Sequence, residues 1–78
     1  MEEEVLKLVA KISKVPKEEL ALESELFESN LISSLGLLEM VDEIERLFKV
    51  MVLPEELIKE NFSTIGKMLE FISGKMNG

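Results

Sequence analysis

The chain has 78 residues, of which 46% are apolar, and a formal net charge of −7. A chain of this length has room for one domain with one modest core, and it is too apolar for a disordered tail. It contains no cysteine and no histidine, which excludes a thiolate nucleophile, a Cys/His zinc site and a histidine acid–base pair.

The acidic charge limits the class of partner. It repels a phosphate backbone, so nucleic acid is not expected as a partner. Basic patches on other proteins are the natural counterpart, although acidity can equally serve only to keep a small protein in solution. No apolar run approaches the roughly 20 residues that span a bilayer, and the acidic start Met1-Glu2-Glu3-Glu4 is unlike a signal peptide. We expect a single domain over residues 1–78 that is soluble, cytoplasmic and monomeric.

The first predicted helix covers residues 3–14. Apolar side chains recur there at helical spacing, and they are Val5, Leu8, Val9 and Ile12. The acidic residues 2–4 suit the positive N-terminal end of the helix dipole, and Pro16 ends the helix.

A long connection follows over residues 15–32, with a single turn expected at residues 17–20. It carries six apolar anchors, which are Leu20, Leu22, Leu26, Phe27, Leu31 and Ile32. A loop of this length with this many apolar residues is predicted to be packed against the core.

Three further helices are predicted. The central helix covers residues 34–50 with Ser33 as its N-cap. A short third helix lies near residues 54–60, with Pro54 in its first turn. The last helix covers residues 64–73, with Ser63 as N-cap and Gly74 as its stop. The sequence therefore predicts an all-α fold, a small four-helix bundle with three longer helices, one short helix and a long packed first loop.

The central helix carries two apolar residues outside its expected core face. At about 100° per residue, the core arc contains Leu37, Met40, Val41, Ile44, Leu47 and Phe48. Leu35 lies nearly opposite this arc and Leu38 lies outside it, close to three acidic residues, Glu39, Asp42 and Glu45. An exposed apolar spot with an acidic rim suits docking by a partner with a basic rim. Single exposed leucines are also common without a function, and the long loop is an alternative cover for Leu38.

One stretch resembles a known family. The segment Leu26-Phe27-Glu28-Ser29-Asn30-Leu31-Ile32-Ser33-Ser34-Leu35-Gly36 is similar to the signature of the acyl carrier proteins, in which an Asp-Ser-Leu tripeptide opens the second helix. The resemblance continues through residues 41–48, Leu53-Pro54 and residues 61–66, so it covers Val5 to Ile72. Residues 31–38 look more like the D-alanyl and specialised carrier branch than the standard fatty-acid carriers.

The resemblance implies a function centred on Ser34. A phosphopantetheinyl transferase would use coenzyme A and a magnesium ion to attach a 4'-phosphopantetheine arm to its hydroxyl. The arm's thiol would then hold an acyl or aminoacyl group as a thioester, which fits a chain without cysteine. The carrier would not be an enzyme, and it would bind no metal of its own. Its partners would be loading and transfer enzymes with basic docking patches, and the residues expected to contact them are Ser33, Leu35, Leu38, Glu39, Asp42 and Glu45.

A cargo pocket in the bundle is an added hypothesis. Its predicted lining is apolar and comprises Phe27, Leu37, Met40, Val41, Ile44, Ile58, Phe62 and Met68. A wider set of candidates adds Leu26, Leu57, Leu69 and Ile72. Most of these residues also suit an ordinary core.

Three residues depart from the family pattern. Ser33 stands where the family usually has Asp, so it can cap the helix but lacks a charge that the transferase is expected to contact. Gly36 stands where an acidic residue is common, and it is expected to weaken the first turn by up to about 1 kcal/mol relative to Ala. Leu37 replaces a residue that is often smaller or polar. An unmodified carrier-fold interaction module is therefore the alternative function, with Ser33-Ser34 serving only as a helix start.

Overall fold

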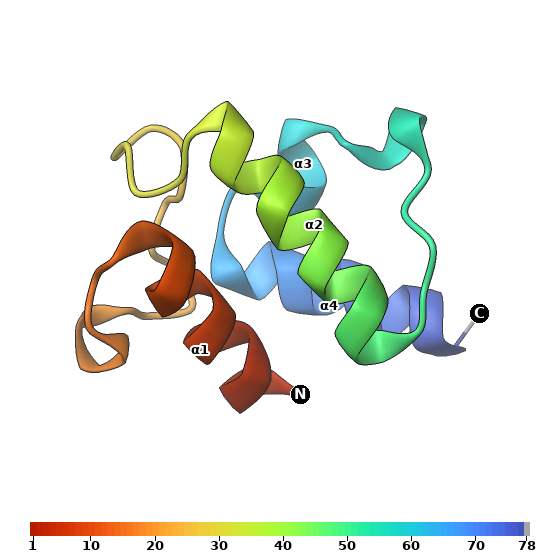
Figure 1. The fold of residues 1–78 in the computed structure, drawn as a ribbon, viewed down its shortest axis with the longest axis horizontal. Helices are drawn as coiled ribbons and strands as arrows, with labels where there is room; N and C mark the ends of the chain where they lie inside the picture. Colours follow the sequence, from red (N-terminus) through yellow and green to blue (C-terminus); the bar gives the residue numbers. More distant parts are fainter. Residues whose placement is uncertain (78) are drawn as a thin grey trace.

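The computed structural model describes residues 1–77 and has the predicted all-helical architecture (Figure 1). Its α-helices, in chain order, are α1 (Glu2–Ser13), α2 (Ser34–Phe48), α3 (Lys59–Phe62) and α4 (Ile65–Asn77). Two 3₁₀ turns lie in the connections, η1 (Lys17–Glu19) and η2 (Pro54–Glu56). Within residues 1–77, extended pairing is limited to one antiparallel bridge between Glu25 and Thr64. The 3₁₀ turn η1 confirms the single turn that was expected at residues 17–20.

The core lies where α1, α2 and α4 meet, and α2 crosses in front of α4 in Figure 1. The side chains that are fully buried are Val5, Val9, Leu26, Met40, Ile44, Phe62, Ile65, Met68 and Ile72. Each fully buried aliphatic or aromatic side chain of this size contributes roughly 1.5–3 kcal/mol of transfer free energy. Val5, Leu8 and Val9 are buried, which confirms the apolar face that periodicity predicts for the first helix.

The long connection between α1 and α2 is packed, as predicted. Leu26 and Ile32 are buried in the core, and the amide of Leu26 donates to the carbonyl of Ser63 at 2.9 Å. The amide of Gly66 donates to the carbonyl of Leu22, also at 2.9 Å. These bonds attach the loop to the start of α4. The side chain of Leu22 is itself 41% exposed and is not part of the core, so its prediction as an apolar anchor is wrong.

Two predictions about the central helix are corrected. Leu47, expected in the core, is 50% exposed. The helix also ends at Phe48 rather than at residue 50, with Lys49 in the left-handed conformation. Gly36, which helical spacing did not place in the core arc, is buried. A Cβ added to it would lie 3.1 Å from Ile12 Cγ2 and 3.2 Å from Ile32 Cγ2. Glycine thus allows α1 and the loop to approach the first turn of α2 closely.

The predicted third helix is divided into two pieces. After η2 the backbone leaves helical geometry, with Ile58 extended at φ −115° and ψ 156°, and α3 begins at Lys59. The side-chain amide of Asn61 donates to the carbonyl of Glu56 at 2.9 Å. It therefore satisfies an acceptor at the end of η2 that a continuous helix would use internally.

The last helix is also capped differently from the prediction. The hydroxyl of Thr64 accepts a hydrogen bond from the amide of Lys67 at 3.1 Å, whereas Ser63 has helical angles at the end of α3. Thr64 is therefore the N-cap. Gly74 does not stop α4, because its φ stays negative. Beyond it, Lys75 pairs with Glu56 at 2.7 Å and lies over the Phe71 ring, which holds the final turn against the rest of the fold.

Substitution of Gly36 tests the close contact with α1. Gly74 is helical with open space around its Cβ position, so Gly74→Ala is expected to stabilise the protein by up to about 1 kcal/mol. Gly36→Ala is expected to gain less stability than Gly74→Ala. Gly36→Val is expected to lower the free energy of unfolding by about 1–3 kcal/mol through overpacking. Urea denaturation measures all three variants. A Gly36→Val protein as stable as the parent would contradict this account.

The cap of α4 is tested by a pair of adjacent substitutions. Thr64→Ala is expected to lower the free energy of unfolding by about 1 kcal/mol, because one helix-end amide loses its acceptor. Ser63→Ala is the control, and we expect a change within about 0.5 kcal/mol. If chemical denaturation shows the larger loss for Ser63→Ala, the assignment of the cap is wrong.

Candidate functional site

Ser34 is the first residue of α2, and its side chain is exposed. The residue before it has extended backbone angles, and the Ser33 hydroxyl accepts a hydrogen bond from the Gly36 amide at 3.1 Å. This confirms Ser33 as the N-cap. Because the cap bond occupies the oxygen of Ser33, the two serines have different surroundings, and Ser34 presents its hydroxyl at the positive end of the helix dipole.

The loop that leads into Ser34 is held by its own hydrogen bonds. The amide of Ile32 donates to the carbonyl of Leu26 at 2.8 Å, and the amide of Asn30 donates to the carbonyl of Phe27 at 3.1 Å. Asn30 takes the left-handed conformation that this tight path requires, and asparagine tolerates it better than most residues. Since Ile32 is also buried, the chain enters α2 along a defined path.

An open cleft of about 360 Å³ lies beside Ser34. Its lining comprises Phe27, Ser34, Leu37, Leu57, Ile58, Lys59 and Phe62. Four of the eight residues predicted for a cargo pocket are therefore brought together here, namely Phe27, Leu37, Ile58 and Phe62. The cleft is mostly apolar, with one hydroxyl and one ammonium group in its lining.

The other four predicted pocket residues lie elsewhere, as Met40, Val41, Ile44 and Met68 are buried in the core. They do not line this cleft. A helical pattern places Met40, Val41 and Ile44 on the same apolar face as Leu37, but it carries no information on which residues of that face meet other helices and which border an opening. Leu57 belongs to the wider set of candidates, and Lys59 was missed because apolar patterning does not select a lysine.

Lys59 forms an ion pair across the fold. Its Nζ lies 3.0 Å from Oε2 of Glu28 in the long loop. This hydrogen bond holds the pKa of the Glu28 carboxyl below its ordinary value, and it raises the pKa of Lys59. The pair connects the loop before Ser34 to the start of α3.

The exposed apolar spot predicted on α2 is present. Leu35 is 69% exposed and Leu38 is 57% exposed, so the long loop does not cover Leu38. Glu39 is exposed on the same helix. Two leucines and a carboxylate thus lie in the open within the first two turns after Ser33.

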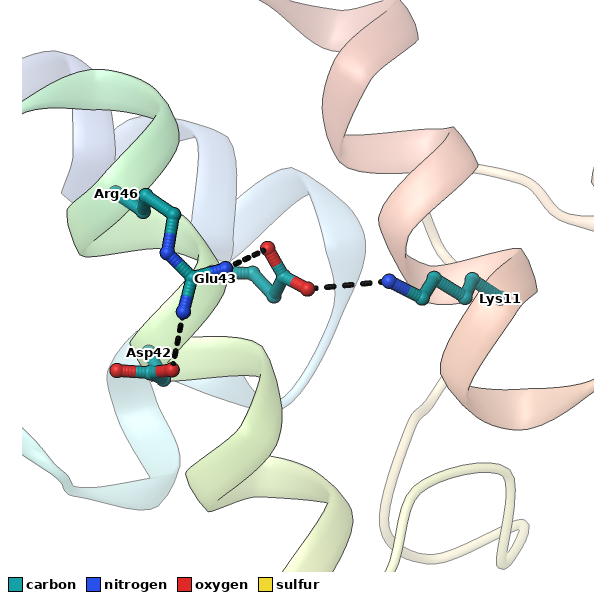
Figure 2. A network of polar contacts seen from close by, with 4 residues as sticks. All are labelled: Lys11, Asp42, Glu43 and Arg46. Carbon is teal, nitrogen blue, oxygen red and sulfur yellow. Dashed lines mark hydrogen bonds and ion pairs between the residues drawn. The ribbon is translucent and has the colours of Figure 1, made fainter.

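The acidic rim is partly neutralised by neighbouring groups (Figure 2). Arg46 binds Asp42 at 2.7 Å and Glu43 at 2.9 Å, and Lys11 of α1 binds Glu43 at 3.1 Å. The Lys11 ammonium lowers the pKa of the Glu43 carboxyl. Figure 2 shows that these four side chains form one chain of contacts from α1 to the outer face of α2.

Glu45 has a different role from that of a free rim carboxylate. Its Oε2 accepts a hydrogen bond from the amide of Val52 at 2.8 Å, and the residue is half-buried. Glu45 therefore attaches the segment after α2 to the helix. Of the three acidic residues predicted for the rim, Glu39 and Asp42 are exposed.

Within residues 1–77, no group of three acidic side chains is arranged to hold a metal ion. Over the same residues, none of the helices combines the length and apolarity needed to cross a bilayer. What the site presents is an exposed alcohol at a helix N-terminus beside an apolar cleft. A phosphodiester on Ser34 fits this place, because backbone amides and the helix dipole favour an anion there.

Comparison with known proteins gives consistent matches. Residues 3–72 match the family described as "Phosphopantetheine attachment site". The chain is 31% identical over 55 residues to a D-alanyl carrier protein of Streptococcus uberis, with 70% of each chain covered. Its fold is similar to the solution structure of a holo acyl carrier protein from Nitrosomonas europaea, with a TM-score of 0.85 and 20% identity over 99% of this chain and 96% of that one.

These matches confirm the resemblance to the acyl carrier proteins and to their D-alanyl branch. The family match covers nearly the whole length of the chain, from the start of α1 into α4. The chain therefore belongs to the phosphopantetheine-attachment family, as a carrier protein that binds a phosphopantetheine arm for the shuttling of acyl or aminoacyl groups.

Proposed function

We propose that Ser34 is the residue that carries the arm. In the modification, a phosphopantetheinyl transferase moves the phosphopantetheine of coenzyme A to Ser34 Oγ, and the hydroxyl proton and adenosine 3',5'-bisphosphate leave. The observation that carries the proposal is the exposed hydroxyl at the first residue of α2, beside the cleft. The arm supplies the thiol that the chain lacks.

The electrostatics of the helix start favour the modified state. A phosphodiester on Ser34 places one negative charge at the N-terminus of α2, where an exposed anion gains about 0.3–1 kcal/mol from the dipole. Within α2, the first turn carries no acidic side chain that would oppose this charge. Gly36, where the family often has an acidic residue, contributes to this absence.

We also propose that the cargo is a short aminoacyl group, with D-alanyl as the first candidate. One support is the similarity to a D-alanyl carrier protein. A second is the division between cleft and core, because Met40, Ile44 and Met68 are fully buried. A long acyl chain would have to displace these side chains, whereas a short group on the arm needs only the open cleft.

The partners of this carrier would be its transferase and its loading and transfer enzymes. The carrier itself would be a monomer, and it would bind these enzymes in the cytoplasm. We propose that they contact the exposed Leu35 and Leu38 together with Ser33, Glu39 and Asp42. Exposed leucines flanked by acidic residues fit an apolar dent with a basic rim. Glu45 is assigned only a secondary part in docking, because its carboxylate is bonded to the Val52 amide. The protein transports the bound group and is not itself the catalyst.

An unmodified interaction module is the second candidate function. The observation in its favour is Ser33, which stands where the family usually has Asp and whose hydroxyl is occupied by the helix cap. This module would bind partners through the same leucines without carrying an arm. The two functions differ in one measurable property, which is the mass of the chain after exposure to a transferase.

Modification of Ser34 is tested by co-expression with a broad-range phosphopantetheinyl transferase. We expect the parent chain to gain one phosphopantetheine mass increment by intact mass spectrometry, and Ser34→Ala to gain none. Ser33→Ala is the matched control and should still be modified, because it loses the cap and keeps the Ser34 hydroxyl. An unmodified parent chain would favour the interaction module, and an increment that persists in Ser34→Ala would place the arm elsewhere.

Docking is tested on the three exposed leucines of α2. A leucine buried in an interface contributes about 1.5 kcal/mol, which corresponds to roughly tenfold in kcat/KM. We expect Leu35→Ala and Leu38→Ala each to lower the kcat/KM of modification by about this factor. Leu47→Ala is the control, since Leu47 is also exposed, at 50%, but lies about 18 Å along the helix from Leu35. Equal losses for all three variants would contradict the proposed docking surface.

A further inference from the structure

The cleft beside Ser34 has one charged side chain in its lining among the described residues, which is Lys59. Lys59 begins α3, and its ammonium is paired with Glu28 of the long loop at 3.0 Å. Both side chains are mostly exposed, at 64% and 60%. A fixed positive charge thus lies in the wall of the same cleft that Ser34 borders.

Nearby acidic side chains favour the charged form of Lys59. Glu25, Glu28 and Glu60 all act on it and raise its pKa, so its ammonium stays protonated at neutral pH. Without Lys59, the lining of the cleft would hold no charged side chain among the described residues. A phosphodiester on Ser34 would then have only the N-terminus of α2 as a favourable electrostatic partner at the cleft.

We propose that Lys59 is a positioning residue for the arm, and that in the modified protein its ammonium leaves Glu28 and binds the phosphodiester on Ser34. This inference rests on the proposed attachment at Ser34. The contact directs the arm along the apolar wall of the cleft, which includes Leu57 and Ile58. The effect is to hold the arm at the cleft rather than free in solvent.

The exchange of Glu28 for the phosphodiester as the partner of Lys59 costs little free energy. An exposed ion pair between a lysine and a carboxylate contributes little net stability because it is solvated and screened. The lysine ammonium lies on a flexible four-carbon stem and serves as a compact binder of phosphate. One exposed pair replaces another, and the released Glu28 carboxylate is hydrated at the surface.

The alternative is a purely structural role, in which the Lys59–Glu28 ion pair only connects the long loop to α3. In that case the pair would persist after modification. The two accounts differ in how Glu28 titrates, because the hydrogen bond from Lys59 is the largest cause of its lowered pKa. Glu56 provides an internal control, since its pKa is lowered by a similar bond from Lys75, which does not line the cleft.

The experiment compares the apo and modified chains by carbon-detected NMR titration of glutamate carboxyls, with ³¹P NMR of the modified chain. Intact mass is measured first, so a chain that is not modified at Ser34 fails the proposed function before this inference is tested. On modification we expect the pKa of Glu28 to rise towards its ordinary value, because it loses the hydrogen bond from Lys59, and that of Glu56 to stay constant. The parent chain alone gives this comparison, so it does not depend on the folding of a variant.

Two variants separate the loss of the ion pair from the direct field of the phosphate. In Lys59→Gln, the pKa of Glu28 should be raised already in the apo chain, and modification should raise it less than in the parent. The ³¹P resonance should move in Lys59→Gln and stay in place in Lys67→Gln, whose side chain belongs to α4. An equal rise of the Glu28 pKa in parent and Lys59→Gln, or an unchanged ³¹P resonance in Lys59→Gln, would overturn the proposal.

Discussion

The first turn of α2 is held by a contact at Gly36 that joins two distant parts of the chain. Ile12 of α1 and Ile32 of the long loop both approach the place that a Cβ would occupy, at 3.1 and 3.2 Å. The Ser33 hydroxyl caps the same turn through the Gly36 amide. The position of Ser34 and the direction in which its hydroxyl points depend on this turn. The propensity cost of glycine is therefore offset by the close packing that it permits.

The surface around this turn has both charges, despite the net charge of −7. Arg46 and Lys11 pair with the acids of α2, and Lys59 pairs with Glu28. Because these pairs are exposed, they are weak and can be exchanged. A partner with a basic rim competes with the chain's own cations for the same carboxylates. Docking is thus expected to depend on the exposed leucines for affinity and on charge for encounter.

The separation of cleft and core limits the size of the cargo that the carrier can hold. Three of the four predicted pocket residues that are absent from the cleft are fully buried, and tightly packed interiors resist the insertion of extra atoms. The cleft itself is open, and Ser34, the proposed attachment residue, is part of its lining. A carrier built in this way presents its cargo on the arm at the surface, which agrees with the proposal of a short aminoacyl group.

Local patterns in the sequence were sufficient to predict most of the helices, the Ser33 cap, the packed loop and the exposed Leu35 and Leu38. Each of these depends on spacing and capping among residues close in the chain. The family signature around Ser34 is equally local, and it predicted the phosphopantetheine arm, with Ser34 as its proposed attachment residue.

Only the tertiary structure decided the remaining features. The burial of Gly36, the exposure of Leu47 and the break before α3 result from contacts with other elements. The division of one apolar helix face into core and cleft is of the same kind, because a helical period assigns residues to a face but does not specify what covers it. The pairing of Lys59 with Glu28 joins residues 31 positions apart, and such a distance in the chain has no signature in spacing.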